Sequence, residues 1–153
     1  MDHPFHVGIV GSRRRNNLPD RRMVFALVRQ MMAEHGENLV LVSGAAKQGA
    51  DSFAKEASVL YKVPIIEYPV DTTGIKGKWQ FTQRAYERNR KIAEKAQELF
   101  CLVHLDRTGG TENTIKHALE LKTKIFLVDM MGRVYLSEDG RLPTCDPVRR
   151  LLD

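Results

Sequence analysis

Short apolar runs alternate with longer amphipathic stretches along most of this 153-residue sequence. The apolar runs predict buried strands over residues 5–11, 39–44, 63–68, 98–105 and 124–130. The amphipathic stretches predict helices over residues 19–36, 50–62, 80–97 and 112–122. Because strands that alternate with helices build βαβ units, we expect an α/β protein with a mainly parallel sheet of about five strands and helices on both faces.

The length of the chain suits one domain, which we place over residues 1–153 with its alternating core over residues 5–130. The segment 131–153 is polar and contains the sequence Glu138-Asp139-Gly140, which is typical of a turn. We therefore expect a small C-terminal hairpin and a basic tail after the core.

The net charge of +5 favours anionic partners, either nucleic acid or the phosphate of a nucleotide. Cys101 lies in an apolar run and Cys145 in the polar tail, and the two form neither a disulfide framework nor a metal-ligand motif. The N-terminal residues lack the apolar segment of a signal peptide, and no run approaches the roughly 18 apolar residues of a membrane span. We expect a cytoplasmic protein with no membrane partner, no metal and no resident cofactor.

A distinctive loop follows each of the first four predicted strands. Their sequences are GSRRRN, SGAAKQGAD, PVDTTGIKGKW and HLDRTGGT. Parallel strands end at one edge of the sheet, and ligands of such sheets bind beyond that edge. We therefore expect the loops to gather around one crevice.

The first loop combines Gly11, Ser12 and Arg13. A glycine permits a tight turn, and a hydroxyl beside a guanidinium suits a phosphate, to which arginine donates two parallel hydrogen bonds. Arg13 is expected to point into the crevice, and Arg14 and Arg15 are expected on its rim. For this loop alone, a strand-end turn followed by solvated arginines is an equal alternative, because the later glycines of the dinucleotide fingerprint are missing.

The second loop carries Ser43, Gly44 and Gly49 just before a predicted helix. Free backbone N–H groups and the positive end of the helix dipole make such a loop a candidate anion cradle. The Gly-Lys-Ser/Thr ending of a P-loop is absent, which argues against ATP hydrolysis. Asp51 is expected to cap the helix.

The fourth loop repeats this arrangement with Gly109, Gly110 and Thr111. Two such loops in one small sheet favour a phosphate site over ordinary connectors. Arg88 and Asn89, on the third predicted helix, are expected to reach the same region. Trp79 has two balanced interpretations, stacking on a base or filling the core.

These motifs, in their order and spacing, resemble the SLOG superfamily over residues 7–128. The resemblance rests on GSR, SGAAKQGAD, ERNRKI and GGTENTIKHAL. The superfamily includes the DNA-processing protein DprA/Smf, the lonely-guy (LOG) phosphoribohydrolases, also called lysine-decarboxylase-like proteins, and the small YpsA-like proteins. The resemblance implies a Rossmann-like three-layer fold, a nucleotide-type ligand and a homodimer.

The fourth loop departs from the LOG pattern P-G-G-x-G-T-x-E, whose glutamate serves catalysis. Thr108 stands in place of the proline, Asn113 stands two residues after the threonine, and a carboxylate lies next door at Glu112. Hydrolysis of a glycosidic bond requires a carboxylate beside the cationic sugar, so Glu112 and Asp51 are the candidate catalytic residues.

Three functions follow from the residues and the resemblance. The first, which we favour, is binding of a nucleotide or nucleotide-derived ligand without turnover. The second is an N-glycosidase that releases the base from nucleoside 5′-monophosphates. The third is DprA-like binding of single-stranded DNA along a basic rim, whose members are Arg13, Arg14, Arg15, Arg21, Arg22, Lys76 and Lys78.

Overall fold

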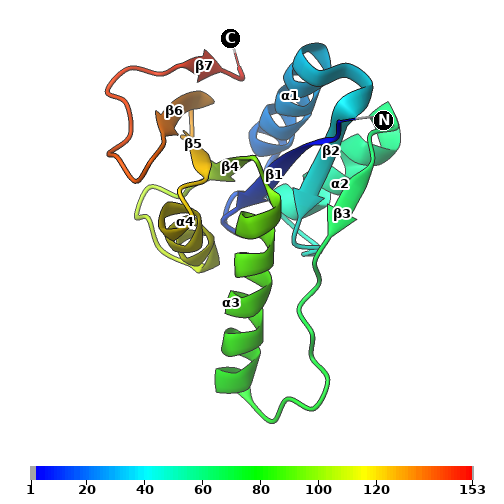
Figure 1. The fold of residues 1–153 in the computed structure, drawn as a ribbon, viewed down its shortest axis with the longest axis vertical. Helices are drawn as coiled ribbons and strands as arrows, with labels where there is room; N and C mark the ends of the chain where they lie inside the picture. Colours follow the sequence, from blue (N-terminus) through cyan, green and yellow to red (C-terminus); the bar gives the residue numbers. More distant parts are fainter. Residues whose placement is uncertain (1–2, 153) are drawn as a thin grey trace.

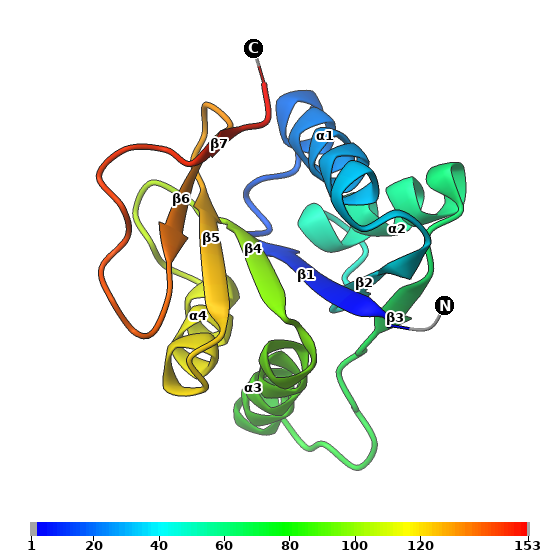
Figure 2. The same ribbon diagram turned by 45° about the horizontal axis from the view of Figure 1, so that its top comes forward.

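The computed structural model describes residues 3–152, which form one sheet with helices on both of its faces (Figures 1 and 2). The strands are β1 (Phe5–Gly11), β2 (Leu39–Ser43), β3 (Ile65–Glu67), β4 (Glu98–Leu102), β5 (Lys124–Val128), β6 (Arg133–Ser137) and β7 (Arg149–Arg150). The helices are α1 (Leu18–His35), α2 (Ala50–Tyr61), α3 (Lys78–Lys95) and α4 (Gly110–Glu120), with a 3-10 turn η1 (Gly36–Asn38).

The strand order is β3-β2-β1-β4-β5-β6-β7, and the first five strands along this order are parallel. The order reverses between β1 and β4, which both lie in the centre of the sheet. Helices α1 and α2 cover one face, and α3 and α4 cover the other (Figure 2). The expected three-layer α/β fold is confirmed. The reversal also marks the place where sheets of this kind bind ligands.

Each face of the sheet has its own apolar core. The core under α1 and α2 is the larger and includes Met23, Leu27 and Met31, all with no exposed surface. The core under α3 and α4 includes Ile92, Leu99 and Cys101. Cys101 has no exposed surface, and its burial raises the pKa of the thiol.

The ends of α1 follow from its sequence. The side chain of Asn17 accepts a hydrogen bond from the backbone N–H of Asp20, Pro19 lies in the first turn, and Gly36 follows the last residue with a positive φ of 56°. The prediction that Asp51 caps α2 is wrong. Gly49 occupies the cap position with a φ of 79°, and Asp51 lies in the first turn, where it turns back toward the preceding loop.

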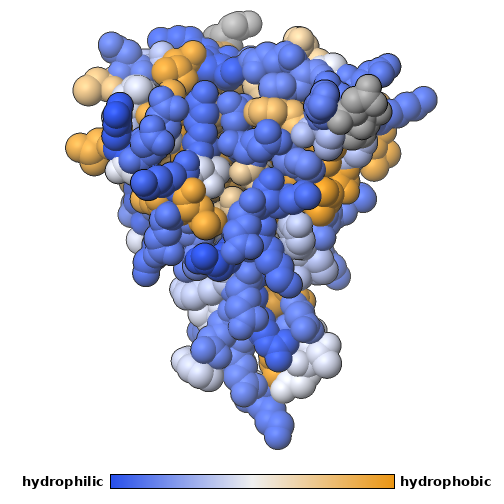
Figure 3. Space-filling view, in the orientation of Figure 1, coloured by the Kyte–Doolittle hydropathy of each residue, from blue (hydrophilic) through white to orange (hydrophobic). Residues whose placement is uncertain are grey.

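Helix α3 projects beyond the rest of the molecule. Its first half and the segment that leads to it from β3 extend away from the sheet (Figure 1). Its buried residues are Asn89, Ile92 and Ala93, all in the second half. The projecting part has a mostly hydrophilic surface (Figure 3). The sheet therefore anchors only the C-terminal half of α3.

The C-terminal segment completes the sheet on its far edge. Strand β6 pairs antiparallel with β5, and β7 pairs antiparallel with β6. The buried Leu151 joins the core beside α1, and Arg149 donates a hydrogen bond to Gln30 of that helix. The antiparallel pairing was expected, but the turn at residues 138–140 leads into a long loop before β7 rather than into a tight hairpin.

Candidate functional site

A cavity of about 520 Å³ lies at the carboxyl ends of the central strands. Three segments that follow strands contribute to it: the loops after β1 and β2 and the loop before α4. The fourth wall is α3, through Phe81, Ala85, Arg88 and Ile92, whose spacing places them on one helical face. The loop between β3 and α3 runs to the projecting end of the helix instead of joining the crevice (Figure 1).

Arg13 differs from the other arginines of the cavity in its contacts. It lines the cavity and is exposed. Within residues 3–152, its side chain makes no hydrogen bond and no ion pair. A guanidinium without internal partners is free to receive an anion, and the phosphate-binding role of Arg13 stays a prediction.

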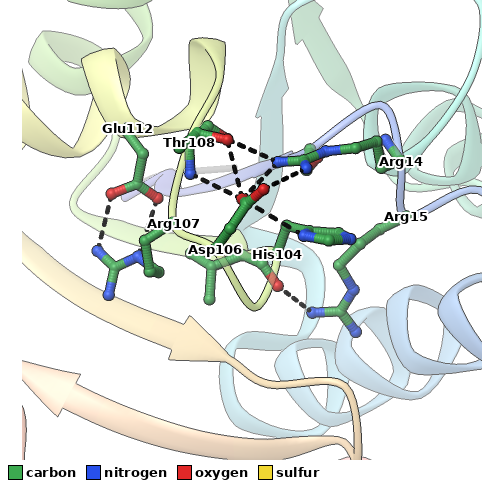
Figure 4. A network of polar contacts seen from close by, with 9 residues as sticks. Arg14, Arg15, His104, Asp106, Arg107, Thr108 and Glu112 are labelled. Carbon is green, nitrogen blue, oxygen red and sulfur yellow. Dashed lines mark hydrogen bonds and ion pairs between the residues drawn. The ribbon is translucent and has the colours of Figure 1, made fainter.

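Arg14 also lines the cavity, but its guanidinium is engaged. It donates to both carboxylate oxygens of Asp106, at 2.6 and 2.7 Å, and to the side-chain oxygen of Thr108 at 3.0 Å (Figure 4). The hydrogen bonds from Arg14 hold the pKa of Asp106 well below its usual range. The pair ties the loop after β1 to the loop before α4.

The expectation that Arg15 lies on the rim is wrong. Its side chain is completely buried and paired with Asp20 at 3.0 Å, and that carboxylate is itself 1% exposed. The same guanidinium donates to the backbone carbonyls of Val103, Val128 and Asp129. These carbonyls lie at the ends of β4 and β5, so Arg15 supplies donors to acceptors at the ends of two strands. Two of them, Val128 and Asp129, also accept from backbone N–H groups. The three adjacent arginines therefore have different surroundings: Arg13 is free, Arg14 is paired at the surface and Arg15 is buried.

Gly11 and Gly44 are required because other groups approach their α-carbons closely. A side chain on Gly11 would meet Cβ of Ala50 at 2.9 Å and Cβ of Leu102 at 3.0 Å. On Gly44 it would meet Nη1 of Arg88 at 2.7 Å. The sequence assigned both glycines to ligand binding, but their immediate role is to let loops, helices and strands pack closely around the cavity.

Polar groups of the second loop are already hydrogen-bonded to other groups of the chain. The carboxylate of Asp51 accepts hydrogen bonds from the Ser43 hydroxyl at 3.0 Å and from the Ala46 backbone N–H at 3.1 Å. The Gly49 N–H donates to the side chain of Asn16 at 2.7 Å. Burial raises the pKa of Asp51, although these hydrogen bonds oppose the rise. Of this group, Asp51 lines the cavity, and Ser43, Gly44 and Gly49 lie behind it.

Arg88 and Asn89 both reach the cavity from α3. Arg88 donates at 3.2 Å to the carbonyls of Gly44 and Tyr68, at the ends of β2 and β3. Burial lowers its pKa, and the charge of Asp51 opposes that change. The Asn89 amide donates to Asn113 at 3.1 Å. These contacts hold α3 against the loops.

The loop before α4 presents open backbone to the cavity. Gly109, Gly110 and Thr111 line it, and a side chain on either glycine would meet no atom within 4 Å. Gly109 occupies the cap position with a φ of 106°, and no side chain caps the helix. The first N–H groups of α4 are therefore available to an anion, whereas in the second loop the N–H groups of Ala46 and Gly49 already donate to side chains.

Glu112 and Trp79 lie outside the cavity lining. The carboxylate of Glu112 accepts two hydrogen bonds of 2.9 Å from Arg107 (Figure 4). Trp79, at the projecting end of α3, is 71% exposed, so the prediction that it fills the core is wrong. Its stacking on a base and the catalytic role of Glu112 stay predictions that this geometry does not favour.

The residues of the predicted basic rim do not form one continuous set of free surface cations. Arg14 is paired with Asp106, Arg21 with Glu56, and Arg15 is buried. Lys78 is the first residue of α3, and Lys76 lies two residues before it. Binding of single-stranded DNA and the homodimer stay predictions.

Sequence reasoning missed several residues of the site. Gln48, Phe81, Thr82 and Tyr86 line the cavity, and Asp106 holds Arg14. Asp106 had a detectable signal, because it is a charged residue placed just after a buried strand. The α3 residues had no such signal in the sequence, because whether they reach the cavity depends on how far the helix extends beyond the sheet.

Helices of the described residues include none that is both long and apolar enough to cross a membrane. No family model matches the chain, and no curated protein matches it. Among solved structures, it is similar to the molybdenum cofactor binding protein from the phototrophic bacterium Rippkaea orientalis, with a TM-score of 0.63 and 14% identity. The match covers 84% of this chain and 78% of that chain. At this identity, the likeness shows a shared fold.

Proposed function

We propose that the protein binds a small anionic ligand, a nucleotide or nucleotide-derived molecule, in the cavity at the strand ends. The observation that carries the proposal is the pairing of the free Arg13 guanidinium with the uncapped N-terminus of α4 across one cavity. The two supply a bidentate donor and open backbone N–H groups, which is the combination that recognises phosphate.

The charges of the cavity favour a ligand with one phosphate group. Arg14 is paired with Asp106, and Arg88 is hydrogen-bonded to Asn89 and to two backbone carbonyls, which leaves Arg13 as the cavity-lining arginine without an internal partner within residues 3–152. Phe81 and Tyr86 supply aromatic surface on the α3 wall, which suits a planar ring. The resemblance to SLOG proteins agrees with a nucleotide. The structural neighbour is described as binding a cofactor, which agrees with a small-molecule ligand.

The test is a thermal-shift screen across nucleotides, followed by calorimetric titration of the best ligand. Arg13→Ala should weaken binding about tenfold or more, since a hydrogen bond to a charged group contributes roughly 1.5–3 kcal/mol. Arg22→Ala is the matched control, because Arg22 is exposed and lies outside the cavity lining. A screen with no stabilising nucleotide, or equal losses from both variants, would overturn the proposal.

A second candidate function rests on Asp51. Its carboxyl lines the cavity, and burial raises its pKa, a property of groups that transfer protons. If the protein hydrolyses nucleoside 5′-monophosphates, chromatography will detect free base, and Asp51→Asn will abolish its release. Glu112→Gln should have little effect, because Glu112 is bound to Arg107 outside the cavity lining. Binding without release of base would leave the first function alone.

A further inference from the structure

Asp106 lies beside the phosphate site but belongs to none of the roles assigned above. Its carboxylate is 50% exposed and sits between the loop after β1 and the N-terminus of α4 (Figure 4). One oxygen, Oδ1, accepts from the backbone N–H of Thr108 at 3.2 Å and from its hydroxyl at 2.8 Å. Both oxygens accept from Arg14, and His104 lies 3.4 Å from Oδ1.

Arg14 is thus held in a fixed position although it lines the cavity. It also donates to the Thr108 carbonyl at 3.2 Å and to the Thr108 hydroxyl at 3.0 Å. Four donated hydrogen bonds leave this guanidinium little capacity for a ligand. Hydrogen bonding to Asp106 raises the pKa of Arg14, and the depressed pKa of Asp106 means that the carboxylate stays charged at neutral pH.

We propose that Asp106 is a specificity residue that holds Arg14 away from the ligand and so limits the charge that the site accepts. The inference rests on the proposed function. With Arg14 held, Arg13 is the cavity-lining arginine that has no internal hydrogen bond or ion pair within residues 3–152. Release of Arg14 would add a second such guanidinium, and the site would then prefer a diphosphate over a monophosphate group.

Asp106→Asn tests this directly because it removes the negative charge and places an NH₂ group against Nη1 of Arg14, while the amide oxygen can still accept from Thr108. Calorimetric titrations with inorganic phosphate and inorganic pyrophosphate give an affinity ratio for each protein. We expect the variant to shift this ratio toward pyrophosphate about fivefold, the effect of one added charge near the surface. A purely structural role would weaken both probes together and leave the ratio unchanged.

Glu56→Gln is the matched control. It releases Arg21 from an ion pair whose side chains are 41% and 48% exposed, close to the 43% and 50% of Arg14 and Asp106. Arg21 lies outside the lining of this cavity, so the ratio should stay at the wild-type value. The double variant Arg14→Gln/Asp106→Asn should also return to that value, because the added cation is gone.

The outcomes separate the two proposals. If wild type binds phosphate and Asp106→Asn leaves the ratio unchanged, the role of Asp106 is overturned and the proposed function stands. A ratio that shifts equally in the double variant would also overturn it, because Arg14 would not be the cause. Wild type that binds neither probe nor any nucleotide would overturn both.

Discussion

Helices α1 and α3 each have 18 residues but lie in opposite surroundings. Helix α1 has a side-chain cap at Asn17 and buries residues along its whole length, whereas α3 begins at an uncapped glycine and is buried only near its C-terminal end. The arginines of the loop after β1 show the same contrast between buried and unpartnered surroundings. Arg15 is buried against Asp20 and Met23 of α1, and Arg13 is free in the cavity that α3 borders.

The comparison indicates that the two faces of the sheet contribute to different properties of the protein, one to its stability and the other to ligand binding. The α1 side supplies stability through a continuous core, and the α3 side leaves polar groups and part of a helix without internal partners. Groups that stay unpaired in the folded chain are the ones that remain free to bind a ligand. Substitutions on the two sides should therefore separate stability from binding.

The largest expected effect comes from Arg15→Ala. It leaves the buried Asp20 without its partner and removes one hydrogen-bond donor from each of three backbone carbonyls, so the free energy of unfolding should fall by about 3–5 kcal/mol. Urea denaturation followed by circular dichroism measures this change. Arg13→Ala is the control and should stay within about 0.5 kcal/mol of wild type. Equal stabilities of the two variants would contradict the assignment of Arg15 to the α1 side.

A smaller loss is expected from Leu27→Ala in α1. Leu27 has no exposed surface, and the cavity left by its truncation should cost about 2–4 kcal/mol in the same assay. Tyr86→Ala in α3 is the counterpart, and it should cost less than about 0.5 kcal/mol because Tyr86 is 45% exposed. A large loss from Tyr86→Ala would show that the projecting half of α3 packs against something that stabilises the fold.

The smallest effect concerns the pH dependence of stability. The pKa of Asp51 is raised by folding, so the folded state holds its proton more tightly than the unfolded state. The contribution of Asp51 to stability is therefore greatest at low pH and declines as the pH rises from about 4 through the folded pKa. Asp51→Asn lacks this decline, so its stability relative to wild type should increase over that range.

Urea denaturation at several pH values between 4 and 7 measures the difference. Asp71→Asn serves as a control, because the pKa of Asp71 is lowered by hydrogen bonds to Thr73 and its linkage has the opposite sign. Parallel pH profiles for Asp51→Asn and wild type would show that Asp51 is not held in a desolvated position.

The α/β fold was predictable because its signals are local. The apolar runs match the observed strands β1, β2, β4 and β5 closely, and Pro19 and Gly36 mark the ends of α1 as expected. The position of the crevice followed from topology alone, since parallel strands end at one edge. For the same reason Arg13 and Gly109 were assigned to the correct region.

The errors have two causes. Arg14 and Arg15 look alike in the sequence, but Arg14 pairs with the distant Asp106, and Arg15 pairs with Asp20 and donates to carbonyls that lie about 90 or more positions away. Asp51 looked like a helix cap, yet its carboxylate turns back to Ser43 and Ala46, which lie only a few positions before it. In this second case the partners are local, but the folding of the loop decides which of them the carboxylate reaches.

The sequence by itself determined which segments form strands and helices and at which edge of the sheet a ligand can bind, because periodicity and turn residues act over a few positions. The tertiary structure alone decided which of three adjacent arginines is free, which is paired and which is buried. The physical reason is that a guanidinium takes its role from the acceptors around it, and these acceptors are brought together only when β1, β4 and β5 lie side by side.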